Sequence, residues 1–148
     1  IAHGHTFSGH ATACAAAIAV LETIRTENLL ENVVRMGQTL DEALRDRLRE
    51  HPHVGDVRAG GLLRAVELVA DRESREPFGA ALKLHARIKA AAMRHGLMCY
   101  PQGGTVDGIR GDHVTLAPAF IVNESHVEQI VDRLIAAIDE ALEAIRVG

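Results

Sequence analysis

The sequence predicts an α+β fold, within the broad α/β class, in which a small mixed sheet is covered by about three helices. Long segments near both ends of the chain place apolar residues at three- and four-residue intervals, which is typical of helices packed on a core. Between them lie short apolar runs bounded by glycine and proline, which is typical of strands and turns. The 148 residues suit one unit of this kind.

The elements are predicted in the order loop, helix, strand, strand, helix, strand, strand, helix. The first ten residues have neither helical nor strand periodicity, so they are expected to form a loop. The expected elements after it are a helix at 11–48, strands at 53–58 and 62–69, a charged loop at 71–76, a helix at 78–95, a strand at 97–100, a loop at 101–112, a strand at 113–117 and a helix at 123–146.

The first helix is justified by its apolar spacing and by the proline that ends it. Its first turns are rich in alanine, which suits close packing, and Pro52 closes the segment. The polar residues at 26–28 are where we expect this helix to bend or break. Its apolar positions are Ile18, Leu21, Leu29, Val33, Met36, Leu40, Leu44 and Leu48.

Capping and turn residues mark the boundaries of the later elements. Gly60 and Gly61 predict a turn or a tight backbone contact between the first two strands. Gly96 suits the position after a helix C-terminus, and Asn123 suits an N-cap. The middle helix is expected to bury Ala81, Leu84, Ile88 and Ala91.

Composition and charge exclude several classes of protein. The chain is 47% hydrophobic and 24% charged, which is ordinary for a globular protein and unlike a disordered tail. The net charge of −4 argues against a nucleic-acid-binding domain. The longest apolar run, 11–21, is too short to span a bilayer, so we expect no membrane partner. Two cysteines are too few for a disulfide framework, so Cys14 and Cys99 are expected to be reduced core thiols in a cytoplasmic protein.

The first ten residues hold the densest group of functional side chains. His3, His5 and His10 allow a metal site, although no acidic residue or cysteine lies nearby to complete a ligand set. Alternatively, Thr6, Ser8 and the glycines just before a helix N-terminus offer donors to a phosphate. A plain polar loop entering the helix is the third interpretation.

Three blocks of the sequence resemble class III pyridoxal-phosphate aminotransferases, in the order that this family has them. The first is HGHTFSGHATACAAAIAVLETI, which is similar to the segment after the catalytic lysine. The second, His53 to Leu62 followed by Val66-Glu67-Leu68, resembles the family's V-x-x-V-R-G-x-G-L turn and the next strand. The third, Gly111 to Pro118, resembles its G-D-H-x-x-x-A-P-P element. Together the blocks cover nearly the whole chain.

This resemblance implies a fold and a cofactor. The chain would be the C-terminal small domain of a fold-type I pyridoxal-phosphate-dependent transferase, with residues 1–10 ending the large cofactor-binding domain and 11–148 forming the small one. Thr6 matches the threonine that binds the phosphate of pyridoxal 5'-phosphate across the dimer interface. His5 matches a position that lines the substrate pocket in relatives, and we count it with Thr6 as a cofactor-binding candidate.

Departures from the family pattern bear on the substrate. Thr115 stands where acetylornithine-type members have an arginine, which disfavours an ornithine-like substrate. The G-D-H form is more similar to ω-amine and β-amino acid:pyruvate transaminases, which have an arginine a few residues earlier that meets carboxylates. Gly108 occupies that place here, and Arg110 lies immediately before Gly111 in the same Gly-rich loop. Arg110 is therefore the candidate substrate-binding residue, and a solvated loop arginine is an equal alternative.

Other polar residues are assigned structural roles. Arg58 is expected to pair with Asp56 or to cap a turn rather than to bind a carboxylate. Glu67, in an apolar strand, is expected to have a partner or to lie at a sheet edge. Four histidines are expected at the surface: His51, His85, His95 and His126.

The family's catalytic lysine has no counterpart in the chain. Transamination needs a lysine amine that forms a Schiff base with the cofactor and moves the proton. The only lysines are Lys83 and Lys89, in no family-like context, so the chain contains no catalytic residue. The Schiff-base lysine is expected upstream of Ile1, since the chain also lacks an initiator Met, and the chain alone is expected to be inactive.

The leading hypothesis is a C-terminal fragment of an aminotransferase that moves an amino group from an amine or ω-amino acid to a keto acid such as pyruvate. A second copy of the full-length subunit would be its partner, as a homodimer. The alternatives are another class III enzyme (an aminomutase, racemase or decarboxylase) and a non-catalytic dimerisation or metal-binding module. An isolated chain is expected to self-associate, because it would expose apolar surface.

Overall fold

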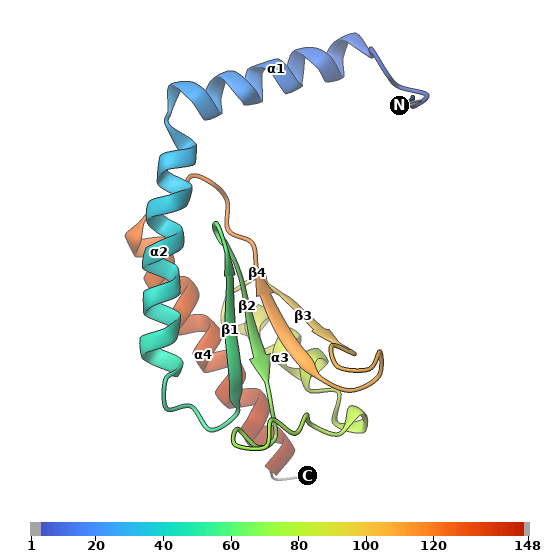
Figure 1. Cartoon of the computed structure of the whole chain (residues 1–148), viewed down its shortest axis with the longest axis vertical. Helices are drawn as coiled ribbons and strands as arrows, with labels where there is room; N and C mark the ends of the chain where they lie inside the picture. Colours follow the sequence, from blue (N-terminus) through green and yellow to red (C-terminus); the bar gives the residue numbers. More distant parts are fainter. Residues whose placement is uncertain (1–3, 147–148) are drawn as a thin grey trace.

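The computed structural model describes residues 4–146, with a four-stranded sheet, four α-helices and one short 3-10 helix (Figure 1). Three helices and the sheet form a compact body, and the first helix projects from it. The elements are α1 (Ala11–Thr26), α2 (Leu29–Leu48), β1 (Val54–Gly60), β2 (Leu63–Leu68), the 3-10 helix η1 (Ala80–Leu82), α3 (Leu84–Arg94), β3 (Tyr100–Gly103), β4 (Asp112–Leu116) and α4 (Glu124–Arg146).

The sheet has the order β1-β2-β4-β3, and every neighbouring pair is antiparallel. The α+β class is confirmed, but the expected mixed sheet is wrong. A parallel pair needs a long crossover, whereas β1–β2 and β3–β4 are hairpins. The two hairpins meet along β2 and β4, where Val66 pairs with Val114. Gly61, with a φ of +57°, makes the tight turn of the first hairpin.

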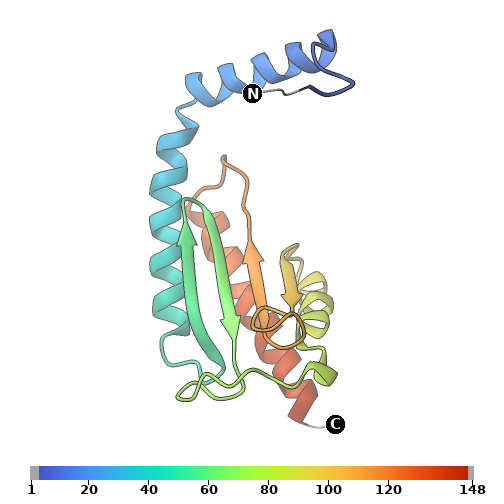
Figure 2. The same ribbon diagram turned by 45° about the vertical axis from the view of Figure 1, so that its right-hand side comes forward.

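The three helices α2, α3 and α4 cover one face of the sheet, as expected (Figure 2). Alternate residues of β2 and β4 are buried on one face because successive strand side chains point to opposite sides. These strands meet helical residues at i, i+4 spacing, such as Met36, Leu40 and Leu44 on α2. The most deeply buried large side chains are Met36, Leu40, Leu44, Leu68, Leu84, Ile88, Leu134, Ile138, Val66, Val114, Val127 and Val131.

Arg64 ties α2 to the β1–β2 hairpin. Its side chain is buried and donates to the carbonyl oxygens of Gly37, Gly61 and Leu63. Its guanidinium also lies 3.4 Å from a carboxylate oxygen of Asp41. Gly37 allows this close approach, since a Cβ there would clash with the Gly61 carbonyl oxygen. The backbones of helix and turn therefore touch directly.

The predicted break in the first long helix is confirmed, and it separates α1 from the body. The chain leaves the helical conformation at Asn28, whose φ is +52°, between α1 and α2. None of the residues of α1 is buried. Figures 1 and 2 show α1 crossing over one end of the body and carrying the N-terminal turn away from it.

Two predicted boundaries and one predicted burial are wrong. The middle helix begins at Leu84 rather than at residue 78, because Lys83 adopts a left-handed conformation (φ +48°) after the 3-10 turn. Ala81 consequently lies in that turn and is exposed. The strand expected at 97–100 begins only at Tyr100. The predicted caps hold: Gly96 has a φ of +73° after α3, and the Asn123 side chain accepts from the backbone at the start of α4.

Candidate functional site

Thr6 lies in a tight turn immediately before α1. The turn closes through two hydrogen bonds: the backbone N–H of Ser8 donates to the His5 carbonyl at 2.9 Å, and the N–H of His5 donates to the Ser8 hydroxyl at 3.1 Å. Gly9, with a φ of +78°, redirects the chain into the helix. Thr6 and His5 are both exposed, so the turn presents them outward from the end of α1.

The N-terminus of α1 favours an anion near this turn. His10 caps the helix, since its Nδ1 accepts from the backbone N–H of Ala13 at 3.3 Å. The first turn of α1 contains no acidic residue that would offset the positive end of the helix dipole. A hydroxyl donor held just before such a terminus can bind a phosphate oxygen. The geometry therefore fits the phosphate interpretation of the loop.

Arg110 lies in the loop between β3 and β4 and is held by two carboxylates. Its Nε lies 2.8 Å from Asp107 Oδ2, and its Nη1 lies 3.4 Å from Glu76 Oε1. Backbone N–H groups of Ile109 and Arg110 also donate to Asp107. The backbone and side-chain bonds from Arg110 lower the pKa of Asp107 to about 2. The same pairing raises the pKa of Arg110, so this arginine stays charged.

A buried carboxylate, which the sequence did not identify, anchors the base of this loop. Asp112 is 4% exposed and accepts from both the backbone N–H of His85 (2.9 Å) and its Nδ1 (2.6 Å). His85 is therefore half-buried, and its expected surface position is wrong. The aspartate of the G-D-H block was the signal that could have located this pair. Nearby, Thr105 Oγ1 lies 2.6 Å from His113 Nδ1.

The two candidate regions lie apart in the molecule. The turn with Thr6 is at the outer end of α1, which projects beyond the body, whereas the β3–β4 loop with Arg110 lies on the flank of the body (Figures 1 and 2). A single copy of the chain therefore does not bring Thr6 and Arg110 to one pocket.

The structural roles expected of Arg58 and Glu67 are confirmed, whereas the core position expected of Cys14 is wrong. Arg58 pairs with Asp56 at 3.1 Å and also with Glu67, as expected for both structural roles. Cys14, expected in a core, is exposed because α1 buries nothing, and Cys99 is half-buried. Burial raises the pKa of the Cys99 thiol.

The other expected surface histidines differ in burial. His95 and His126 are exposed, and His95 pairs with Glu140 at 2.8 Å. His51 is half-buried like His85, so its expected surface position is also wrong, and its Nε2 lies 3.2 Å from Asp139 Oδ1.

Two features of residues 4–146 bear on the metal-binding and membrane alternatives. No group of three or more His, Cys, Asp or Glu side chains is arranged there to hold a metal ion. His3, a member of the hypothetical metal set, lies outside the described residues. Within the same residues, no helix combines the length and apolar character needed to cross a membrane.

The family model for class III aminotransferases matches residues 1–138 of the chain. This chain belongs to the class III aminotransferase family. The match covers the turn with Thr6, the sheet and most of α4, and it confirms the resemblance on which the site candidates depend.

Among the relatives of this class III chain, an aminotransferase from Gibberella zeae is 42% identical over 95% of the chain and 28% of that protein. A taurine–pyruvate aminotransferase from Bilophila wadsworthia is 38% identical over 95% of the chain and 29% of that protein. The crystal structure of a thermostable omega transaminase from Pseudomonas jessenii superimposes with a TM-score of 0.81, at 38% identity, over 95% of this chain and 29% of that one. The chain thus spans less than a third of the length of these relatives.

Family membership implies pyridoxal 5'-phosphate in the full-length enzymes, and the described residues fit part of its site. Thr6, exposed before the dipole of α1, suits the phosphate. Lys83 and Lys89 lie at the start of α3 and on it, on the body rather than beside the turn, so neither accompanies Thr6. Thr6 therefore suits a phosphate, and neither lysine of the chain lies beside it.

Proposed function

We propose that this chain is the C-terminal part of an aminotransferase that moves an amino group from an amine or ω-amino acid to a keto acid such as pyruvate. The observation that carries the proposal is the turn with Thr6 at the positive end of α1, in a chain of this family. The named relatives include a taurine–pyruvate aminotransferase and omega transaminases, which supports this substrate class.

The proposal divides the chain by role. Residues 1–10 end the large domain, and 11–148 form the small domain, with α1 linking the two. Thr6 donates its hydroxyl to the cofactor phosphate, and His5 lines the same pocket. Because Thr6 projects away from its own body, we assign it to the active site of the neighbouring subunit in a homodimer. When bound, the cofactor supplies the electron sink for transamination. The enzyme is assigned to the cytoplasm.

The first experiment extends the reading frame upstream of Ile1 and assays the intact protein for amino transfer to pyruvate. A lysine shortly before His3, whose replacement by alanine abolishes transfer, supports the proposal. Thr6→Ala should then weaken cofactor binding roughly tenfold or more, because a hydrogen bond to a charged phosphate is lost. Thr6→Ser should restore it. Thr12→Ala, at an exposed threonine on α1, is the matched control. Unchanged affinity in Thr6→Ala would refute the assignment.

We further propose that Arg110 binds a substrate carboxylate. Its side chain is half-exposed, and the guanidinium already pairs with carboxylates in this structure. Arg110→Ala should raise the KM for pyruvate roughly tenfold, as expected for the loss of a charged hydrogen bond, without a matching effect on amines that lack a carboxylate. Equal effects on pyruvate and on such amines would show that Arg110 stabilises the loop and does not bind the substrate carboxylate.

A further inference from the structure

The loop that carries Arg110 is closed at its base by one pair of residues. Gly103 at the end of β3 pairs with Asp112 at the start of β4. Within the loop, the backbone N–H of Val106 donates to the Arg110 carbonyl at 3.0 Å. Gly111, with a φ of +91°, allows Val106 to approach, since a Cβ at Gly111 would lie 2.8 Å from the Val106 side chain. Because this loop folds back on its own base, the position of Asp112 affects where Arg110 lies.

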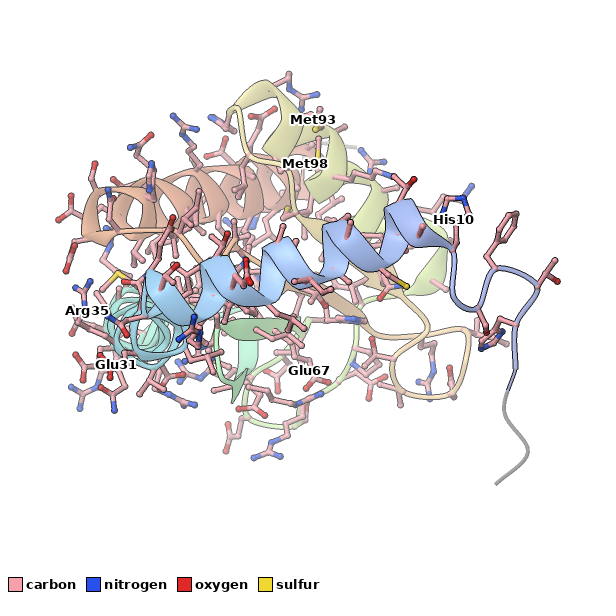
Figure 3. All side chains as sticks on the ribbon, turned by 90° about the horizontal axis from the view of Figure 1, so that it is seen from above. His10, Glu31, Arg35, Glu67, Met93 and Met98 are labelled. Carbon is pink, nitrogen blue, oxygen red and sulfur yellow. The ribbon has the colours of Figure 1, made fainter. Side chains whose placement is uncertain are left out.

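Asp112 lies on the face of the sheet that the helices cover. Asp112 and His113 follow one another in β4, so their side chains point to opposite faces. Figure 3, seen from above, shows Glu67 on the side of the sheet away from α3, the helix that carries Met93. Glu67 pairs with His113 across β2 and β4, so these two side chains share the outer face. Asp112 accordingly points toward the helices and is 4% exposed.

The carboxylate of Asp112 is bound twice by His85, in the first turn of α3. Its Oδ1 accepts from the backbone N–H of His85 at 2.9 Å and from His85 Nδ1 at 2.6 Å. The N-cap position of α3 is occupied by Lys83, whose side chain makes no capping hydrogen bond, so Asp112 caps this helix from β4. A buried carboxylate that loses a donor costs free energy and moves toward water. The imidazole of His85 therefore helps to keep Asp112 in place.

The imidazole of His85 also packs against the other strand at the base of the loop. A Cβ at Gly103 would lie 2.7 Å from His85 Nδ1, so the ring lies directly against the β3 backbone. Since Gly103 and Asp112 are paired, the ring contacts both residues between which the loop leaves β3 and returns to β4. These contacts join the base of the loop to the start of α3.

We propose that His85 is a positioning residue, which holds Asp112 against α3 and thereby fixes the β3–β4 loop and the place of Arg110. The hold on the loop follows from contacts within the body: two hydrogen bonds to Asp112 and the close approach of Gly103. The consequence for the substrate rests on the proposed function, in which Arg110 binds a carboxylate. His85 itself does not touch the substrate in this proposal and acts through Asp112.

The hold on the loop is tested by amide hydrogen exchange of the intact protein, measured by mass spectrometry. His85→Ala removes the Nδ1 donor, so amides 105–110 should exchange roughly tenfold faster, because the loop opens more often. His95→Ala is the matched control, since it breaks a pair of histidine and carboxylate, with Glu140, at the other end of α3. It should leave exchange in the loop unchanged. The amides of β2 report general unfolding and should exchange normally in both variants.

Unchanged loop exchange in His85→Ala overturns the proposal. Faster exchange in β2 to the same extent also overturns it, because the effect would then be a general loss of stability. His85→Asn supplies an amide donor near the place of Nδ1, and restored slow exchange in this variant supports the proposal. If His85→Ala does not fold, Gly103→Ala provides the same test, since its Cβ would displace the ring from Asp112.

The second measurement compares the KM for pyruvate with the KM for an amine that lacks a carboxylate. If Arg110→Ala raises the KM for pyruvate, His85→Ala should raise it as well, by roughly tenfold at most, and should leave the KM for the amine unchanged. A normal KM for pyruvate in His85→Ala, alongside a raised one in Arg110→Ala, overturns the positioning role. A normal KM in Arg110→Ala itself refutes the proposed function of Arg110, while faster loop exchange in His85→Ala still supports the hold of His85 on the loop.

Discussion

Helices α1 and α2 follow one another in the chain, yet they have opposite relations to the core. The 16 residues of α1 include only Glu22 and Arg25 as charged side chains, and none of its residues is buried. In contrast, α2 alternates charged and apolar residues along its 20 residues and buries Met36, Gly37, Leu40, Leu44 and Leu48. The more apolar helix is thus the exposed one.

The difference shows that apolar content and burial within one chain are separate properties. A helix that is apolar on most sides is typical of a buried environment, whereas one apolar stripe suits a helix at the surface of its own core. The sequence of α1 therefore suits a partner surface outside residues 4–146, while α2 packs with α3, α4 and the sheet into one core. The self-association expected of the isolated chain stays a prediction, and α1 is the surface that it would involve.

The largest expected effect tests this contrast with matched leucines. Leu40→Ala on α2 should lower the free energy of unfolding by about 2–5 kcal/mol, because Leu40 is fully buried and its loss leaves a cavity. Leu21→Ala on α1, at a leucine that is 65% exposed, should change it by less than about 0.5 kcal/mol. Urea unfolding of the 148-residue chain measures both. Equal losses would contradict the separation of α1 from the core.

A second pair of variants sharpens the comparison within the body. Gly37→Ala should lower the free energy of unfolding by about 1–3 kcal/mol, because the new Cβ clashes with the Gly61 carbonyl and the hairpin must shift. Gly60→Ala, one residue before that turn, meets no atom within 4 Å and serves as the control. Thermal unfolding of the two variants should differ clearly. A stable Gly37→Ala protein would show that α2 and the hairpin do not pack rigidly.

The sequence predicted most of the fold because local signals specify it. Apolar spacing located the helices, and the polar residues at 26–28 located the break, because each is a property of neighbouring residues. The prediction of a mixed sheet was wrong because strand pairing joins residues that are distant in the sequence, such as Val66 and Val114. The predicted start of the middle helix was wrong because Lys83, a residue type that does not signal a turn, adopts a left-handed conformation.

The candidate site was predicted less completely than the fold. The turn with Thr6 could be located because glycines and hydroxyl residues precede a helix, and the role of Thr6 stays a prediction from the family pattern. The pair of His85 and Asp112 was missed because 27 residues separate them and only the folded sheet brings them together.

The smallest expected effect concerns the β3–β4 loop, in which Asp107 accepts hydrogen bonds from the backbone and the side chain of Arg110. The pKa of Asp107 is lowered from 3.8 to about 2, so its contribution to loop stability is fully present above pH 3.8 and is lost as the pH falls toward 2. Carboxyl chemical shifts in NMR should titrate with a midpoint near pH 2, and the Arg110 side chain should become more mobile over the same interval. Asp107→Asn keeps an acceptor but removes the charge, so this pH dependence should disappear. A midpoint near 3.8 would show that the pair of Asp107 and Arg110 does not form in solution.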